Sequence, residues 1–209
     1  TVWAIDWPGN RDNTAAAEKS QKAQMIEILD RYKAANMNVC FFQVRGFSDA
    51  FYNSEYEPWS KYLCGERGKA PNYDPFQFVI DECHKRGIEC HAWINPYRYE
   101  SVSNQWDGTP QCYRETNPEW MLDVDGATIL NPGIPEVTDQ IVKVIREIVQ
   151  NYDVDGILFD DYFYLSGTPK DSTGDGDLYE AYKAAGGNLS HNDWRRENVN
   201  NMVAAVYNM

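Results

Sequence analysis

The chain has 209 residues, enough for one domain with a sizeable core, and its 43% hydrophobic and 24% charged residues are typical of a globular protein. Its formal net charge of −13 argues against nucleic acid or an anionic membrane surface as a partner, because both are bound by clustered Lys and Arg. A neutral ligand such as a sugar fits better. The 14% aromatic residues are expected to be divided between the core and exposed sugar-stacking positions. No run of about 20 apolar residues occurs, so no membrane insertion is predicted.

The first part of the chain alternates between strand and helix patterns. Residues 2–6 predict a strand, and residues 15–35 predict a helix with one apolar face. A second strand is predicted at 39–45, where alternation separates the apolar face from the face that carries Gln43 and Arg45. We expect the apolar face to meet helices, so these two polar side chains point into a core or a site.

The middle of the chain continues the same alternation. Residues 48–71 form a long aromatic loop, and loops of this length in compact domains are usually functional or disordered. Asp74-Pro75 is a helix start with an Asp cap and a Pro in the first turn, and this helix is expected to end at Arg86. A third strand is predicted at 88–95, with His91, Trp93 and Asn95 on one face.

The last part of the chain contains the fourth strand and helix. Segments 121–123 and 127–130 are expected to pair as a hairpin around Asp125-Gly126. A helix begins at Pro135, a buried strand covers 154–160, and a final helix runs from Trp194 to the end. The inward faces of the two helices are predicted from their apolar residues, which are Val137, Ile141, Val144, Ile145, Ile148 and Val149, and then Val199, Met202, Val203 and Val206.

Strands that alternate with helices predict an α/β fold with a parallel sheet and right-handed crossovers. The strand-to-helix loops are long and the helix-to-strand links are short, which is typical of a TIM-type (β/α)8 barrel. Because such a barrel takes roughly 250 residues, we interpret residues 1–209 as the N-terminal half of one barrel domain, about four β/α units. Such a half barrel is expected to be marginally stable, with two open strand edges. A doubly wound domain complete in itself is the alternative.

The fourth strand ends in two adjacent carboxylates, Asp160 and Asp161, followed by three aromatic residues. Adjacent carboxylates repel each other, so one can keep a proton while the other stays ionised, as acid–base chemistry requires. A helix cap or a loop Asp pair is the structural alternative. Alternation along the strand places Asp160 toward the barrel axis and Asp161 at the rim. We predict both as catalytic residues.

Other polar and aromatic residues gather near the C-terminal ends of the strands, where ligands bind in such folds. Taken singly, His91 also fits a structural role, and Arg45 also fits an ion pair with Asp6 or Asp49. We predict that they bind substrate together with their neighbours; the set is Asp6, Trp7, Gln43, Arg45, Asp49, Tyr52, Trp59, His91, Trp93, Asn95, Tyr97, Arg98 and Tyr162.

No cofactor and no metal are predicted. The sequence lacks a Gly-rich phosphate loop, a Gly-x-Ser-x-Gly elbow and a His-Glu-x-x-His motif. Asp171, Asp175 and Asp177 with Glu180 could hold calcium, but their spacing matches no EF-hand, and a solvated acidic loop is the favoured interpretation.

The five cysteines fit no zinc pattern. Cys40, Cys83 and Cys90 are predicted as buried small hydrophobic residues. Cys64 and Cys112 lie in loops, where free thiols are favoured over a disulfide between them.

Several ordered motifs resemble one bacterial family, the glycosyl hydrolase-like family 10, over nearly the whole chain. The motifs in the first half are Asn36-Met37-Asn38-Val39, Gln43-Val44-Arg45, Asp49-Ala50-Phe51-Tyr52, Pro58-Trp59-Ser60, His84-Lys85-Arg86-Gly87 and His91-Ala92-Trp93-Ile94-Asn95-Pro96-Tyr97-Arg98. Those in the second half are Leu130-Asn131-Pro132-Gly133, Glu136-Val137, Tyr152-Asp153-Val154-Asp155-Gly156, Phe159-Asp160-Asp161-Tyr162-Phe163-Tyr164 and Asp193-Trp194-Arg195-Arg196-Glu197-Asn198-Val199-Asn200. The chain departs from the pattern at Leu158, where relatives often carry a polar residue such as His.

The resemblance implies a TIM-barrel glycosidase domain of an envelope lipoprotein or secreted protein, located outside the cytoplasm. It also implies hydrolysis of a polysaccharide, with peptidoglycan glycan strands the expected substrate class. Two mechanisms are open: either Asp160 is nucleophile or base, or the Asp pair assists attack by the acetamido group of an N-acetyl sugar. The alternative function is a non-catalytic carbohydrate-binding or structural envelope protein on a barrel scaffold.

Overall fold

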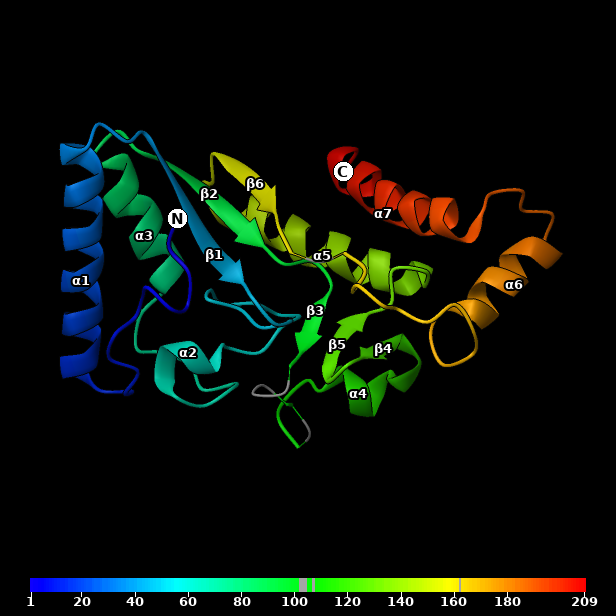
Figure 1. The fold of residues 1–209 in the computed structure, drawn as a ribbon. Coiled ribbons are helices and arrows are strands. Elements are labelled where there is room, and N and C mark those ends of the chain that lie inside the picture. Colours follow the sequence, from blue (N-terminus) through cyan, green and yellow to red (C-terminus); the bar gives the residue numbers. More distant parts are fainter. Residues whose placement is uncertain (102–104, 107, 162) are drawn as a thin grey trace. The chain divides into compact units, whose positions relative to one another are not determined.

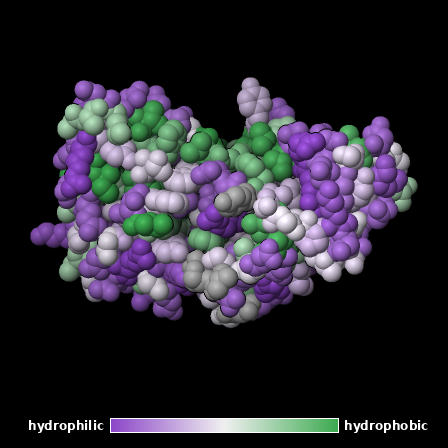
Figure 2. Space-filling model, viewed as in Figure 1, coloured by the Kyte–Doolittle hydropathy of each residue, from purple (hydrophilic) through white to green (hydrophobic). Residues whose placement is uncertain are grey.

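The structure is a computed structural model of the chain, and it describes all of residues 1–209 except 102–104, 107 and 162. The chain divides into two compact units, whose elements are coloured along the sequence in Figure 1. The first unit comprises Thr1–Asn95 and Glu147–Asp160, and the second comprises Pro96–Arg146 and Asp161–Met209. Hydrophilic residues cover much of the visible face (Figure 2), in keeping with the charged composition.

The first unit is built on a parallel sheet of three strands in the order β1 (Val39–Arg45), β2 (Glu89–Ile94) and β6 (Gly156–Phe159). The parallel direction confirms the prediction from the strand–helix alternation, and the three strands lie side by side in chain order, as strands do in the predicted TIM-type barrel. The predicted strand at 2–6 is wrong in extent. It is reduced to one parallel bridge between Val2 and Phe42, because the residues that follow turn back.

Helices α1 (Ala15–Ala34) and α3 (Pro75–His84) cover one face of this sheet (Figure 1). Their ends follow local chemistry: Asp74 accepts the backbone N–H of Gln77 at 3.0 Å, and Asn36 follows α1 with a left-handed φ of 56°. Helix α3 ends two residues before the predicted Arg86. The short α2 (Lys61–Cys64) lies in the long loop.

The two faces of the sheet differ as the alternation predicted. The helix-facing side chains are fully buried, and Phe42 stacks on Phe76 of α3 with ring centroids 5.9 Å apart. On the opposite face, the strand register aligns Phe41, His91 and Gly156 in one row. A row of inward-facing side chains from neighbouring strands is the layered packing of a barrel interior.

The second unit contains an antiparallel sheet in the order β3 (Arg98–Glu100), β5 (Ala127–Leu130) and β4 (Met121–Val124). The predicted hairpin is confirmed: Asp125 and Gly126 both adopt positive φ, 50° and 80°, which a tight two-residue turn requires. The short α4 (Tyr113–Thr116) and the 3-10 helix η1 (Pro118–Trp120) precede it.

Three longer helices complete the chain. Helix α5 (Pro135–Asn151) buries its predicted face except Val149, which is 43% exposed. Helix α6 (Gly176–Ala184) was not predicted, because it is short and begins at a glycine, a residue that disfavours helices. Helix α7 (His191–Tyr207) begins earlier than expected, since the Ser190 hydroxyl caps it, and it exposes Val203.

In the described part of the chain, no helix is both long enough and apolar enough to cross a membrane.

We predict that Gly156→Ala destabilises the first unit by about 1–3 kcal/mol, because a methyl group there would lie 2.6 Å from the His91 ring. Gly46→Ala is the matched control, since its added carbon would meet only Gln43 and Asp49, at 3.4 Å or more. Urea unfolding of the two variants measures the difference. Equal stability of both would contradict the close packing of β2 against β6.

Candidate active site

The candidate site lies at the C-terminal edge of the parallel sheet in the first unit. Beyond the strand ends, the N–H of Asn95 donates to the carbonyl of Arg45 at 2.9 Å, and that of Asp160 donates to the carbonyl of Ile94 at 3.2 Å. The structure thus brings Arg45, Asn95 and Asp160 to one edge. Asp160 is exposed, whereas Asn95 is buried, with its amide donating to the Gly46 carbonyl at 3.4 Å.

A pair of stacked indoles lies next to this edge. Trp93 and Gln43 are register partners on β2 and β1, and both are buried. The Trp3 ring stacks on Trp93 with centroids 5.5 Å apart and planes inclined by 21°, and Trp3 is 38% exposed. Trp3 was not among the residues predicted to bind substrate. Its position next to Val2 could have identified it: Val2 bridges to Phe42 on the helix-facing side, so Trp3 faces the opposite side of the sheet.

Arg45 has a structural partner that the sequence did not identify. Its guanidinium donates to the Glu57 carboxylate at 2.8 Å, the Ser48 hydroxyl at 2.9 Å and the Asn95 carbonyl at 2.7 Å. Both side chains of the Arg45–Glu57 pair are at most 1% exposed. Burial raises the pKa of Glu57, and the Arg45 charge opposes this shift. The predicted partners, Asp6 and Asp49, are therefore corrected to Glu57.

The loop after β1 is packed against this ion pair. Arg67 donates to the Ser48 carbonyl at 2.9 Å, and the buried Asp49 accepts the backbone N–H of Phe47 at 2.9 Å. A parallel bridge joins Ala50 to the half-buried Trp59. This loop was predicted as functional or disordered, and it is ordered by buried polar contacts.

Two aromatic residues that were predicted to bind substrate belong to the core instead. Trp7 is 1% exposed and donates its indole N–H to the Gln21 carbonyl at 2.8 Å. Tyr52 is equally buried, with its ring 5.6 Å from the Tyr152 ring. Neither ring has a face open to stack on a sugar, because helices and loops of the same unit cover both. Sequence position near a strand end did not distinguish them from exposed aromatic residues.

Of three further residues that were predicted to bind substrate, two lie away from the candidate site and one is outside the described part of the chain. Asp6 lies exposed in a turn and does not share the face of a strand. His91 packs edge-on against Phe41, with centroids 5.5 Å apart, and its Nε2 lies 3.0 Å from the Glu89 carboxylate, toward the N-terminal end of β2. Its contacts are those of a structural histidine. Tyr162 lies outside the described residues.

In the second unit, Arg98 forms a bidentate ion pair with Asp161. The guanidinium donates through Nε and one Nη to both carboxylate oxygens, and the Asp161 side chain is 7% exposed. Asp161 adopts a φ of 95°, a region that L-residues avoid and that often marks functional sites. Because both oxygens accept hydrogen bonds from one guanidinium, the carboxylate of Asp161 is held in a fixed orientation. The neighbouring Tyr97 is buried, with its ring 6.3 Å from that of Phe163.

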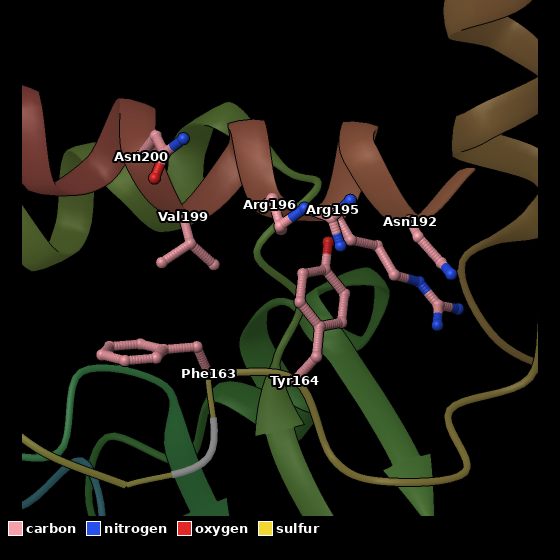
Figure 3. Close-up of a pocket in the computed structure, with 7 residues that line it drawn as sticks. All are labelled: Phe163, Tyr164, Asn192, Arg195, Arg196, Val199 and Asn200. Atoms are coloured by element: carbon pink, nitrogen blue, oxygen red, sulfur yellow. The ribbon is translucent and has the colours of Figure 1, made fainter. Parts of the chain in front are cut away.

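A pocket of about 360 Å³ lies in the second unit, between the segment after Asp161 and α7 (Figure 3). The Phe163 ring lies opposite Val199, and the Tyr164 hydroxyl points toward α7, where Asn198 donates to it at 3.1 Å. Arg195 lies over the Tyr164 ring, 5.3 Å from its centroid. The pocket is lined by Phe163, Tyr164, Asn192, Arg195, Arg196, Val199 and Asn200.

Asp175 fixes Arg195 beside this pocket. The carboxylate is buried and accepts from Arg195 Nε at 2.7 Å, and His191 Nε2 lies 2.8 Å from it. The predicted solvated acidic loop is therefore wrong at Asp175. Among the described residues, no group of His, Cys, Asp or Glu is arranged to hold a metal ion.

The parallel sheet with its helix-covered face defines an α/β fold of the TIM-barrel type. Among solved structures, the chain is similar to α-L-fucosidase isoenzyme 2 from Paenibacillus thiaminolyticus, with a TM-score of 0.56, 13% identity and coverage of 88% of this chain and 26% of that one. It is also similar to the maltogenic α-amylase AmyB from Thermotoga neapolitana, with a TM-score of 0.50, 15% identity and coverage of 88% and 41%. These similarities show the fold.

The family is shown by sequence. The family model described as Glycosyl hydrolase-like 10 matches residues 1–209. The chain is 40% identical over 208 residues to glycosyl hydrolase YngK of Bacillus subtilis (strain 168), and 38% identical over 224 residues to glycosyl hydrolase DigH of Escherichia coli (strain K12). The matches cover 99% of this chain but only 40% and 49% of those relatives. The chain belongs to the glycosyl hydrolase-like 10 family, which confirms the resemblance. The half-barrel interpretation stays a prediction.

Arg45→Met is expected to lower the free energy of unfolding by about 3–5 kcal/mol, because Glu57 would be left buried without its countercharge. The exposed Arg31–Glu27 pair on α1 is the control, and Arg31→Met should cost less than about 1 kcal/mol. A double variant, Arg45→Met with Glu57→Leu, should recover part of the loss. Denaturant unfolding measures all three, and an Arg45→Met cost as small as that of Arg31→Met would refute the structural role.

Proposed function

We propose that the protein hydrolyses glycosidic bonds of a polysaccharide and that its substrate class is bacterial peptidoglycan glycan strands, which contain N-acetyl sugars. Family membership supports the reaction type. The observation that carries the proposal is the position of Asp160, an exposed carboxylate at the C-terminal end of β6. Catalytic residues of TIM barrels lie at this end of the strands. Location in the bacterial envelope is part of the same proposal.

The environments of the two carboxylates support different roles. Asp161 is clamped by Arg98 through both oxygens, so it acts as an oriented negative charge. Asp160 is exposed and is the group that exchanges a proton with substrate or attacks it. Arg98 is then a positioning residue, because it acts through Asp161.

Both mechanisms start from this division of roles. In the substrate-assisted route, the acetamido oxygen attacks the anomeric carbon while Asp161 accepts the acetamido N–H. Asp160 then protonates the leaving oxygen, and water opens the cyclic intermediate. In the double-displacement route, Asp160 attacks the anomeric carbon itself, and a second carboxyl group protonates the leaving oxygen. The first route requires an N-acetyl group on the reacting sugar, whereas the second does not.

Asp160→Asn is expected to lower kcat on purified peptidoglycan glycan strands by at least about 100-fold, because it removes the acid–base or nucleophilic group. Asp153→Asn is the matched control: it is an exposed carboxylate just before the opposite end of β6 and should leave kcat unchanged. Product release is measured on the 209-residue chain and on any longer natural form that contains it.

Three other results of this measurement would each change the proposal. Full turnover by Asp160→Asn would refute its catalytic role. Tight glycan binding without cleavage by any form would support the alternative of a carbohydrate-binding or structural protein. Cleavage of polymers with and without N-acetyl groups at equal rates would exclude the substrate-assisted route.

A further inference from the structure

Three of the five cysteines lie where helix α3 covers the parallel sheet of the first unit. Cys40 on β1 and Cys90 on β2 are register partners in the parallel sheet, and Cys83 lies in the last turn of α3. All three are 0% exposed. Residues 40 and 90 both point to the helix-covered side of the sheet, so the helix brings a third thiol onto two that already lie side by side.

Cys83 is the centre of this cluster, because helix α3 carries it onto the side of the sheet from which Cys40 and Cys90 project. The neighbouring Cys83 thiol, followed by burial, raises the pKa of Cys40. The neighbouring Cys40 thiol lowers the pKa of Cys83, but the Cys90 thiol and burial outweigh it, so the pKa of Cys83 is raised. In the folded chain, Cys40 and Cys83 are therefore protonated, and burial protects all three thiols from reagents in solution.

We propose that this thiol cluster is an oxidation site, at which Cys83 forms a disulfide with either Cys40 or Cys90 and so fastens α3 covalently to the sheet. The two pairings exclude each other, since Cys83 has one sulfur. The third thiol stays free beside the bond and can exchange with it.

The geometry favours Cys83 as the shared partner over a bond between the two strands. Side chains of register partners on parallel strands leave the sheet in the same direction, with a spacing of about 4.8 Å. Disulfides need Cβ atoms about 3.8 Å apart. The helix residue approaches from above, so Cys83 can meet either strand cysteine with converging Cα–Cβ bonds.

The oxidant is a small disulfide of the glutathione class. A Cys83 thiolate attacks one of its sulfurs, giving a mixed disulfide and releasing one thiol. The thiolate of Cys40 or Cys90 then attacks the Cys83 sulfur and releases the second thiol, so two protein thiols are oxidised and one small disulfide is reduced to two thiols. Because all three sulfurs are buried, both steps occur during folding or after local opening of the seam between α3 and the sheet.

The test is refolding of the 209-residue chain in oxidised and reduced glutathione, followed by alkylation in denaturant, intact mass and peptide mapping. Of the five thiols, two should become unavailable to alkylation, and the protein mass before alkylation should fall by about 2 Da. The mapped bond should join Cys83 to Cys40 or Cys90. The oxidised form should melt roughly 5–15 °C higher than the reduced form, because the bond restricts the unfolded chain.

Single variants identify the shared partner. Cys83→Ala should abolish the bond, whereas Cys40→Ala should leave Cys83–Cys90 and Cys90→Ala should leave Cys40–Cys83. The matched controls are Cys64→Ala and Cys112→Ala, buried cysteines outside the cluster, and neither should change the mapped bond. Five free thiols after oxidative refolding, a bond that persists in Cys83→Ala, or a bond to Cys64 or Cys112 would each overturn the proposal. The disulfide map of the wild-type protein tests the proposal even if a variant fails to fold.

Discussion

The backbone ladder of β1, β2 and β6 is the constraint on which the candidate site depends. Parallel strands in register end at the same edge, so residues far apart in sequence are aligned without any contact between their side chains. The ladder continues past the strand ends at Asn95 and Asp160, whose N–H groups bond to carbonyls of the neighbouring strand. The same register also aligns the two thiols on the helix-facing side. One set of backbone hydrogen bonds therefore organises both the C-terminal edge of the sheet and its helix-facing side.

Buried charge is used in this protein to hold loops in place. Arg45 would be costly in the interior by itself, but it is paired with Glu57, which lies within the long loop after β1. A second ion pair joins the buried Asp175 to the half-buried Arg195 in the second unit, and it fixes the segment before α6 against α7. In each case the ionic pair lies in or next to an irregular segment and fixes it in place. A loop ordered in this way can present side chains at a site with little loss of entropy on binding.

The two carboxylates after β6 illustrate how a small change of position alters chemistry. Asp160 continues the ladder of the first unit, whereas Asp161 begins the second segment of the second unit and turns to a positive φ. The turn aims the second carboxylate at Arg98, while the first stays exposed. Adjacent residues of the same type thereby reach different surroundings, which is the usual way in which paired carboxyl groups obtain different roles.

The sequence by itself determined the fold class, the family, the strand order, the turn at Asp125-Gly126 and the cap at Asp74, because alternation and capping are local signals that are read within a few residues. The tertiary structure decided what long-range packing controls. It assigned Glu57 as the partner of Arg45, placed Trp7 and Tyr52 in the core, and added Trp3 to the indole pair. Burial and partner choice depend on residues tens of positions away, and the pattern of one segment carries no information about which of them will fold against it.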